Sequence, residues 1–408
     1  SGIGVYRGQE FQNIVSRGHW QVFVAEMVIK KTLSQLENFI KIHKMYLIKG
    51  CYDESTELLT SDGFKHVKDI EIGDLALAFD PKSGELKWEP IEDLLITYWE
   101  GSMYKLVHAY DKSLLVTEGH TCIYEDHRHF KYNGERRLVV RRVENLLSTK
   151  WRPKGKIKLI RDKYFLPLGS WRGRKSRFSA DELKLIAWLI TEGNREHHTY
   201  GWRYMIKQKN PKYIDEIEKL LEHLRLDPER SVDSKGSRIW RFRKKDNEYI
   251  YSLIGDSWKE IPREILDSTP QELEVFFNEL MKGDGHNDGH CYYTSNPKLR
   301  DQIQEILFKL GFATSYYHRK ENKFIDNNKV YKCKDDFIIN KTREPGSLKK
   351  IERVSYQGLV WCPKVKSGFV VVRRDGKLFI SGNTHEQQEN NYMLYLRKIF
   401  DPMAVYAS

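Results

Sequence analysis

The spacing of apolar residues changes abruptly at residue 50. From Gln9 to Lys49 apolar side chains recur at steps of three and four residues, a period typical of amphipathic helix. Beyond that point, short apolar runs such as Leu75 to Phe79 alternate with turn pairs such as Asp62-Gly63. Short runs between glycine-containing turns indicate β-strands. The pattern therefore predicts helix before residue 50 and a β-rich module after it.

A helical pattern returns between about Ser176 and Lys341, and it occurs twice. Leu185 to Gly193 and Phe277 to Gly285 are both apolar helical segments that end in an acid and a glycine. Behind each comes a helix start, at Asn210-Pro211-Lys212 and at Asn296-Pro297-Lys298, because proline is favoured just inside a helix. Two copies of one pattern predict a domain with pseudo-twofold symmetry.

After this repeat the β pattern resumes. The predicted strands are Ile351 to Val354, Leu359 to Val365, Phe369 to Val372 and Leu378 to Ile380. Asp375-Gly376 predicts a hairpin turn between the last two. Gln387 to Phe400 then has the period of another amphipathic helix. The β module is thus interrupted by the repeat and flanked by helices.

Charge adds a candidate partner. The chain has 408 residues, enough for two or three domains, and 69 Lys+Arg against 57 Asp+Glu give a net charge of +12. Basic residues are dense between Arg128 and Arg177 and alternate with aromatics, which suits a surface that follows phosphates and also an ordinary solvated face. The residues expected to contact nucleic acid are Arg136, Arg137, Arg141, Arg142, Arg172, Arg174, Lys175, Lys207 and Lys209.

The cysteines and the hydropathy of the chain bear on the cellular compartment and on membrane association. The five cysteines are odd in number and lack paired spacing, so neither a disulfide framework nor a zinc site is expected. This favours a reducing, intracellular compartment such as the cytoplasm. No apolar run is long enough to span a bilayer and the start is not a signal peptide, so we expect no membrane partner. We also expect a monomer.

The boundary at residue 50 also carries candidate chemistry. Cys51 is a potential nucleophile toward the carbonyl of Gly50, because a thiolate attacks acyl groups readily; the alternative is a cysteine without chemistry. Thr117-Glu118-Gly119-His120 follows a strand-like run. The His120 imidazole can protonate a departing amide nitrogen, and the Thr117 hydroxyl can hold the scissile peptide or its developing oxyanion.

Together, Cys51, the Thr117/His120 motif, the Asn383-Thr384 pair and the doubled helix-acid-Gly motif resemble an intein carrying a LAGLIDADG homing endonuclease. The resemblance covers Cys51 to Asn383. It implies a multidomain fold: a mainly-β, horseshoe-like Hint splicing domain, interrupted by an α+β pseudo-twofold endonuclease domain, with helical host segments on either side. The implied domains are a host fragment at 1–50, the first part of the splicing domain at 51–175 with a basic DNA-contacting extension at about 128–175, the endonuclease at 176–341, the second part of the splicing domain at 342–383 and a host fragment at 384–408.

The resemblance implies self-splicing without a cofactor, in a single turnover. Cys51 would attack the Gly50 carbonyl, Thr384 would attack the resulting thioester, and Asn383 would cyclise to release the insert. An oxygen-to-nitrogen shift would then join Gly50 to Thr384. The competing interpretation is a DNA-binding or nuclease protein whose β module does not splice.

Three positions depart from the family pattern. Inteins usually place histidine before the terminal Asn, but this chain has Gly382 there, and Val365 to Phe369 lacks a second helper histidine. Cys362 stands where many relatives carry aspartate. A thiol there either assists or carries the branched intermediate, or it packs in the core. From these departures we expect slow splicing.

In the endonuclease part, the resemblance places the helices that end at Glu192 and Asp284 side by side. Such a contact needs small residues, which Ala187, Thr191 and Gly283 supply but Glu279 does not. Paired carboxylates then suit Mg²⁺, which positions water and offsets charge at the phosphate. The DNA partner implied is the uninterrupted host gene. The candidates for a basic residue near the leaving group are Lys207, Lys209, Lys320 and Lys323.

Overall fold

The computed structural model describes residues 50–126, 137–148, 157–160, 164–198, 201–320, 322–326, 329–333 and 335–382. The predicted helices before residue 50 and after residue 386 lie outside these ranges, as do Arg136, Asn383 and Thr384. The chain divides into two compact units. We call Leu168–Glu344 the inserted unit, and the described residues up to Pro167 and from Pro345 onward the β unit.

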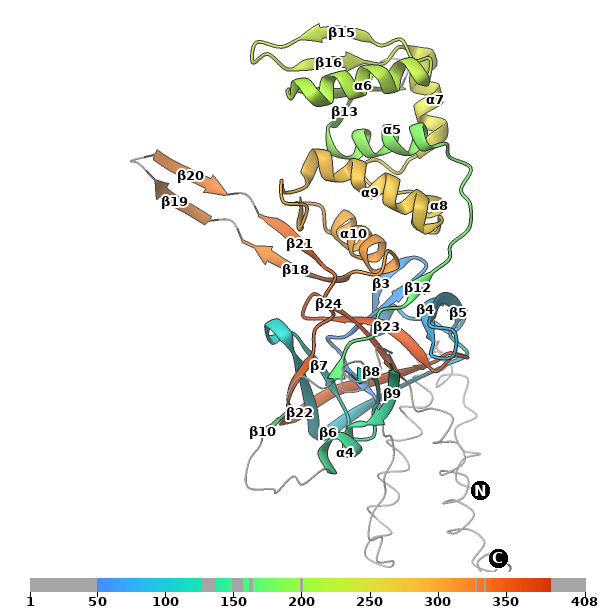
Figure 1. The fold of residues 1–408 in the computed structure, drawn as a ribbon, viewed down its shortest axis with the longest axis vertical. Helices are drawn as coiled ribbons and strands as arrows, with labels where there is room; N and C mark the ends of the chain where they lie inside the picture. The colour runs from blue at the N-terminus through green and yellow to red at the C-terminus, as the bar shows by residue number, and fades with distance from the viewer. Residues whose placement is uncertain are drawn as a thin grey trace, which may run out of the picture. The chain divides into compact units, whose positions relative to one another are not determined.

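The β unit is built almost entirely of strands (Figure 1). Its one described α-helix is α4 (Val143–Ser148). Its strands are β1 (Tyr52–Asp53), β2 (Glu57–Thr60), β3 (Gly63–His66), β4 (Leu75–Asp80), β5 (Glu85–Pro90), β6 (Asp93–His108), β7 (Ser113–Val116), β8 (Thr121–Asp126), β9 (Arg137–Arg142), β10 (Ile157–Leu159), β11 (Tyr164–Phe165), β22 (Leu348–Lys364), β23 (Phe369–Arg374) and β24 (Lys377–Gly382).

Strand pairing brings the beginning and the end of the β unit together. β1 pairs with both β7 and β22, and β6 also pairs with both, so these four strands form a closed ring of pairings. β24 pairs with β23 along its whole length and with β8 at Ser381 opposite Cys122. The segment after Gly50 and the segment before residue 383 therefore lie in two different sheets of the β unit. Tyr52 of β1 and Phe379 of β24 belong to one buried core.

The structure corrects one strand prediction and confirms another. The two runs predicted at 351–354 and 359–365 are a single strand, β22, paired with β6 from Leu348 to Lys364. The polar residues between the runs alternate toward solvent, so they interrupt the apolar pattern without ending the strand. The hairpin turn is confirmed: Asp375 and Gly376 both have positive φ, as a two-residue turn between β23 and β24 requires.

The inserted unit combines helices with two sheets (Figure 1). Its helices are α5 (Ala180–Thr191), α6 (Pro211–His223), α7 (Lys244–Ile254), α8 (Arg263–Leu266), α9 (Pro270–Asp284) and α10 (Pro297–Lys309). One sheet has the order β13-β14-β16-β15, formed by Gly193–His198, Gly201–Gln208, Arg238–Arg241 and Glu229–Val232. In the other, β21 (Asp336–Thr342) pairs with β17 (Cys291–Thr294) and β18 (Ala313–Arg319); β19 (Asn322–Asp326) and β20 (Lys329–Cys333) form a separate hairpin, and β12 (Ser170–Trp171) precedes α5.

The two copies of the sequence repeat fold alike. Ser179 and Thr269 begin α5 and α9 with the same reciprocal capping arrangement, in which a glutamate three residues later bonds back to the cap. Asn210 and Asn296 cap α6 and α10, with proline at the first helical position, so both predicted helix starts are confirmed.

Helices α5 and α9 lie side by side (Figure 1). Their contact is closest near their C-terminal ends, where a Cβ on Gly283 would lie 2.4 Å from the Cβ of Thr191. Only glycine fits that approach. The described part of the chain contains no helix long and apolar enough to cross a membrane.

Candidate functional sites

The peptide bond between Gly50 and Cys51 is held by Thr117. The backbone N–H groups of Gly50 and Cys51 both donate to Thr117 Oγ1 at 2.8 Å, and the Thr117 N–H donates to the Cys51 carbonyl at 3.1 Å. Thr117 directly follows β7, which pairs with β1, so the sheet sets this spacing. Gly50 has φ of +122°, which a residue with a Cβ adopts only under strain.

His120 lies on the opposite side of the same peptide group. Its Nδ1 is 2.9 Å from the Gly50 carbonyl oxygen, and its Nε2 is 2.7 Å from Ser381 Oγ. Burial lowers the pKa of His120 to about 4, with the bond to Gly50 acting in the other direction, so the ring is neutral near pH 7. We expected the imidazole at the amide nitrogen; it lies at the carbonyl oxygen, and Thr117 binds the amide side.

The end of β24 lies beside His120 and the Gly50–Cys51 peptide group. Besides the contact of Ser381 with His120, the Tyr52 hydroxyl donates to the Gly382 carbonyl at 3.1 Å, and the Tyr52 ring packs edge-on against His120. Neither Ser381 nor Tyr52 was predicted to be a site residue. The only available signal was that Ser381 stands two residues before Asn383.

Cys51 and Cys362 occupy neighbouring buried positions. β1 and β22 pair antiparallel with Tyr52 opposite Trp361, so continuing the register by one residue sets Cys51 opposite Cys362. Both belong to one buried cluster with Met103, Leu115 and Val360, and neither forms a disulfide. Core packing and participation in acyl transfer both remain compatible with this position of Cys362.

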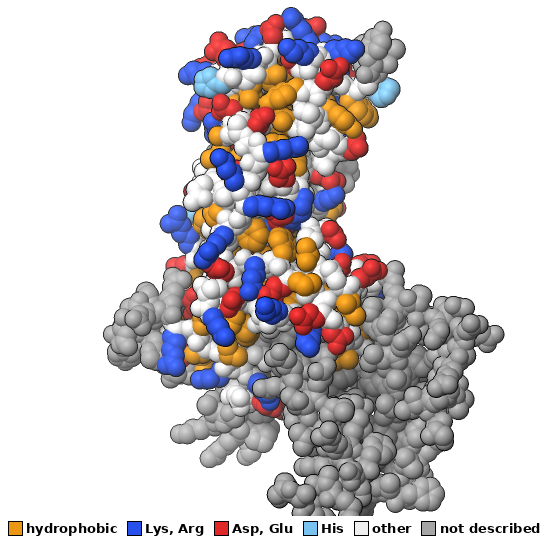
Figure 2. Space-filling view, turned by 90° about the vertical axis from the view of Figure 1, so that its right-hand side faces the viewer, with side chains coloured by type: hydrophobic (Ala, Val, Ile, Leu, Met, Phe, Trp, Pro, Cys, Tyr) orange, Lys and Arg blue, Asp and Glu red, His pale blue; other side chains and the backbone are white. Residues whose placement is uncertain are grey.

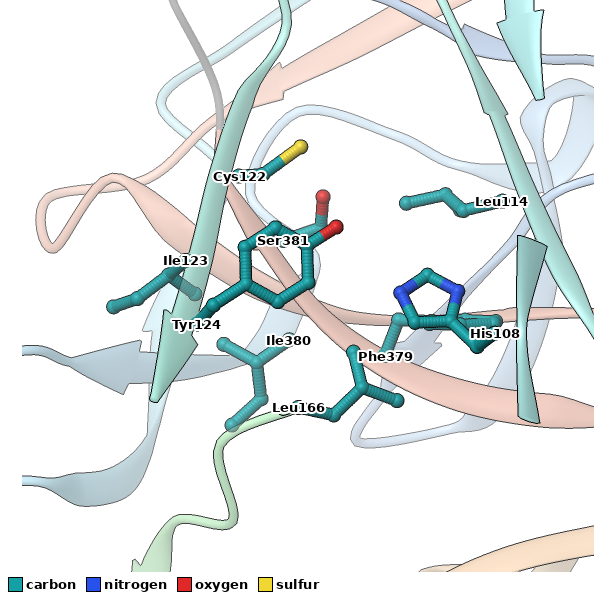
Figure 3. A pocket seen from close by; sticks show the side chains of 9 residues that line it. All are labelled: His108, Leu114, Cys122, Ile123, Tyr124, Leu166, Phe379, Ile380 and Ser381. Carbon is teal, nitrogen blue, oxygen red and sulfur yellow. The ribbon is translucent and has the colours of Figure 1, made fainter. Parts of the chain in front are cut away.

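A small cavity in the β unit is lined by Ser381, Cys122, Tyr124 and His108, together with apolar side chains (Figure 3). His108 is buried, and neither of its ring nitrogens has a hydrogen-bond partner among the described residues. Burial and then the charge of Lys377 lower the pKa of His108 to about 3, whereas burial raises that of the Cys122 thiol to about 12. Both groups are therefore neutral near pH 7. His108 was also missed by the sequence analysis.

In the inserted unit, the two predicted acids are brought together. Glu192 caps the C-terminal end of α5, and Asp284 is the last residue of α9. Burial raises the pKa of both carboxyl groups, and the charge of Asp284 raises that of Glu192 further. A charge acts this way only on a nearby group. The Tyr292 hydroxyl also donates to Asp284 Oδ2 at 3.4 Å.

A lysine that the sequence analysis did not name accompanies this pair. The Lys259 ammonium donates to the carbonyl oxygens of Ile190 and Thr191, at 2.7 and 3.1 Å, in the last turn of α5. Its charge interacts favourably with Asp284 and Glu192, although burial lowers its pKa to about 8. A lysine at the C-terminal end of a helix is also stabilised by the helix dipole.

The four lysines proposed for this role have different surroundings. Lys207 pairs with Asp233 at 2.6 Å. Lys209 and Lys320 are exposed, and the side chain of Lys323 lies outside the described residues. Lys259 escaped notice because it lies in the segment between the two copies of the repeated motif, far from both acids in sequence.

The ligand chemistry of Glu192 and Asp284 fits a divalent cation such as Mg²⁺, since both offer hard carboxylate oxygens that burial makes costly to charge. Within the described ranges no three or more His, Cys, Asp or Glu side chains are grouped to hold a metal ion.

The predicted DNA-contacting residues fall on several elements. Arg137 and Arg141 are exposed on β9 with Arg142 partly exposed beside them, and Arg172, Arg174 and Lys175 are exposed before α5. Lys and Arg side chains alternate with acidic ones over the face in Figure 2. On the hairpin of β13 and β14, the Arg195 guanidinium lies 4.1 Å from the exposed Trp202 ring, a pair the sequence analysis missed.

No family model matches the chain. The beta subunit of ribonucleoside-diphosphate reductase from Aquifex aeolicus (strain VF5) is 26% identical over 400 residues, covering 85% of this chain and 52% of that protein. The chain thus spans about half the length of this curated relative.

Similar solved structures fall into two kinds. One is the homing endonuclease I-DmoI in complex with DNA and Ca, at 15% identity, 40% of this chain, 83% of that chain and a TM-score of 0.30. The other includes the AceL NrdHF class 3 split intein, at 8% identity, 82% of this chain, 98% of that chain and a TM-score of 0.30. The gp41-1 intein is a further example, at 16% identity, 24% of this chain, 61% of that chain and a TM-score of 0.17.

Proposed function

We propose that the chain is a self-splicing precursor, in which residues 51–383 excise themselves and Gly50 becomes joined to Thr384. The observation that carries this proposal is that the Gly50–Cys51 peptide group is hydrogen-bonded on both sides, by Thr117 at its N–H and by His120 at its carbonyl oxygen. A peptide group fixed in this way beside the Cys51 thiol has the arrangement that acyl transfer needs.

In the first step the Cys51 sulfur attacks the Gly50 carbonyl carbon. The carbon–nitrogen bond breaks, the thiol proton passes to the Cys51 nitrogen, and a thioester remains. His120 Nδ1–H donates to the carbonyl oxygen as negative charge develops there, and Thr117 keeps the nitrogen side in place.

The later steps move the acyl group to the other junction. The Thr384 hydroxyl displaces the Cys51 thiolate from the thioester to give an ester, with Cys362 either carrying the acyl group in between or only packing beside Cys51. The side-chain amide nitrogen of Asn383 then attacks its own carbonyl, which forms a succinimide and cuts the 383–384 bond. The freed Thr384 nitrogen takes the acyl group from its oxygen and restores a peptide bond.

The reductase match supports an insertion into a host protein. Residues outside 51–383 make up less than a fifth of the chain, so a match over 85% of it must run through the proposed insert. We infer that residues 1–50 and 384–408 are pieces of a host related to the beta subunit of ribonucleoside-diphosphate reductase.

Mass spectrometry after expression tests the splicing proposal. We expect an excised protein of residues 51–383 and a ligated product of residues 1–50 and 384–408, formed slowly because Gly382 replaces the usual histidine. The matched control is the double variant Cys51→Ala, Asn383→Ala, which should stay intact. A wild-type chain that also stays intact on long incubation with thiol would contradict splicing and favour the nuclease-only alternative.

We further propose that the inserted unit cuts double-stranded DNA at the uninterrupted host-gene site. The supporting observation is the convergence of Glu192 and Asp284 at the ends of two packed helices. When bound there, Mg²⁺ would supply charge stabilisation and an activated water. Glu192 and Asp284 would hold the ion, while the cation of Lys259 would keep the pair from repelling in its absence.

Cleavage of a plasmid that carries the joined host sequence, with Mg²⁺ present, tests this second proposal. Glu192→Gln with Asp284→Asn should abolish cleavage and leave DNA binding in place. Glu222→Gln on the exposed face of α6 is the matched control and should cut normally. Unchanged cutting by the double variant would remove the assignment of these acids.

A further inference from the structure

His120 is held at both of its ring nitrogens, by residues from opposite ends of the β unit. Nδ1 lies 2.9 Å from the carbonyl oxygen of Gly50, and Nε2 lies 2.7 Å from the hydroxyl of Ser381, which is 261 residues further along the chain. His120 and Ser381 are both buried, with exposed fractions of 0% and 2%. Water therefore does not compete for either bond.

The direction of each hydrogen bond follows from the acceptor at Gly50. A carbonyl oxygen only accepts, so Nδ1 must carry the proton. A neutral imidazole has one N–H, which leaves Nε2 with a lone pair. The Ser381 hydroxyl then donates to Nε2. The resulting chain runs from Ser381 O–H to Nε2, and from Nδ1–H to the Gly50 carbonyl, so each bond polarises the next toward the carbonyl oxygen.

The backbone next to Ser381 is tied down as well. The Tyr52 hydroxyl donates to the Gly382 carbonyl at 3.1 Å, and Ser381 pairs with Cys122 of β8 in the sheet. The position of the Ser381 hydroxyl thus depends on how the last residues of β24 are seated. These residues lead directly into Asn383.

We propose that Ser381 is a positioning residue for the first acyl shift: its hydroxyl orients His120 with Nδ1–H toward the Gly50 carbonyl, so attack at the first junction requires the strand that leads to the second junction to be seated. This inference rests on the proposed splicing function. The reaction stays balanced, because Ser381 and His120 give up no proton overall, and the Cys51 thiol proton ends on the Cys51 nitrogen.

The reaction test isolates the first step. In an Asn383→Ala background, which blocks the second junction, added thiol releases residues 1–50 from any thioester that forms. We expect Ser381→Ala to slow this release roughly ten-fold or more, because the His120 ring loses a buried hydrogen bond that sets its orientation. Ser381→Thr keeps the hydroxyl and should restore the rate. Ser355→Ala, an exposed serine on β22, should react like the parent.

The spectroscopic test does not depend on any reaction. In the intact Cys51→Ala, Asn383→Ala chain, the ring ¹⁵N signals of His120 should show a protonated Nδ1 and a hydrogen-bonded, unprotonated Nε2. The Nε2 signal should shift in Ser381→Ala and return in Ser381→Thr. A protonated Nε2 in the parent chain would overturn the inference, because Ser381 would then be the acceptor.

The outcomes separate this inference from the proposed function. A wild-type chain that forms no cleaved or spliced product overturns the splicing proposal and the role of Ser381 with it. A parent that releases residues 1–50, accompanied by a Ser381→Ala variant that does so equally fast, overturns the role of Ser381 alone.

Discussion

Two buried histidines of the β unit stay neutral at pH values at which a free histidine would become protonated. His120 faces Gly50, Ser381 and the Tyr52 ring, and its pKa is lowered to about 4; His108 faces Tyr124, Phe379 and the charge of Lys377, and its pKa is lowered to about 3. A depressed pKa means that the unfolded chain binds the proton more tightly than the folded one.

The β unit should therefore lose stability in acid. The stability due to these histidines is complete above about pH 6.5, their ordinary pKa, and is lost as the pH falls toward 4 and 3. For His120 alone the loss is roughly 3 kcal/mol, from the pKa difference multiplied by about 1.4 kcal/mol per unit. Urea unfolding of the Cys51→Ala, Asn383→Ala chain between pH 8 and pH 4 measures it.

His108→Leu supplies the comparison. It removes a ring whose nitrogens have no partner among the described residues, so its stability at pH 8 should equal or exceed that of the parent. Its stability should also fall less between pH 6.5 and pH 4. An acid dependence identical to that of the parent would show that His108 is not held neutral.

At the scale of single elements, the end of β24 is too closely packed for a side chain at residue 382. A Cβ on Gly382 would lie 2.9 Å from the carbonyl oxygen of Thr121 and 3.0 Å from the Phe369 ring. A histidine at this position therefore does not fit this packing without movement of β8.

We predict that Gly382→His does not accelerate cleavage at the 383–384 bond, but slows it and lowers the yield of folded chain. The rate of C-terminal cleavage in a Cys51→Ala background measures the effect. Lys366→His, at an exposed position, is the control for an added imidazole. Faster cleavage in Gly382→His would show that an imidazole fits at residue 382, against this prediction.

In the inserted unit, the close contact between α5 and α9 leads us to predict that a larger side chain at residue 283 is destabilising. Gly283→Ala would insert a methyl group 2.4 Å from the Thr191 side chain and should lower the free energy of unfolding by about 1–3 kcal/mol. Urea denaturation measures the loss, with Glu222→Ala on exposed α6 as the control. An unchanged unfolding midpoint would be inconsistent with such close helices.

At the scale of the whole molecule, the chain leaves the β unit near residue 167 and returns to it near residue 345, and these two points are adjacent. Phe165 bridges to Ser347, and the Leu166 N–H donates to the Gly346 carbonyl at 3.1 Å. The ends of the β unit on either side of residues 168–344 are therefore already paired, and a short loop can connect them.

Replacing residues 168–344 with a short Gly-Ser linker should preserve splicing and remove DNA cleavage. Mass spectrometry of the spliced products and plasmid cleavage measure the two activities. Changing Glu192 and Asp284 in the full chain is the matched control, since it should remove cleavage without changing splicing. A shortened chain that folds but does not splice would show that the inserted unit contributes to the first site.

The sequence by itself predicted the features that depend on residues a few positions apart. These features are the helix caps at Asn210 and Asn296, the Asp375-Gly376 turn and the acid-glycine ends of the repeat. The same holds for the candidate Cys51 and for the motif that contains Thr117 and His120. Only tertiary structure decided which atoms these groups face.

Strand register over long separations brought Ser381 to His120 and set Cys362 beside Cys51, and the turn after α7 brought Lys259 to the two acids. Close approach of β8 and β24 leaves no room for a side chain at residue 382 without movement of its neighbours. Such contacts join segments far apart in the sequence, and their geometry depends on the elements between them. Residue types and spacing therefore predicted the chemical groups, whereas the fold determined their partners.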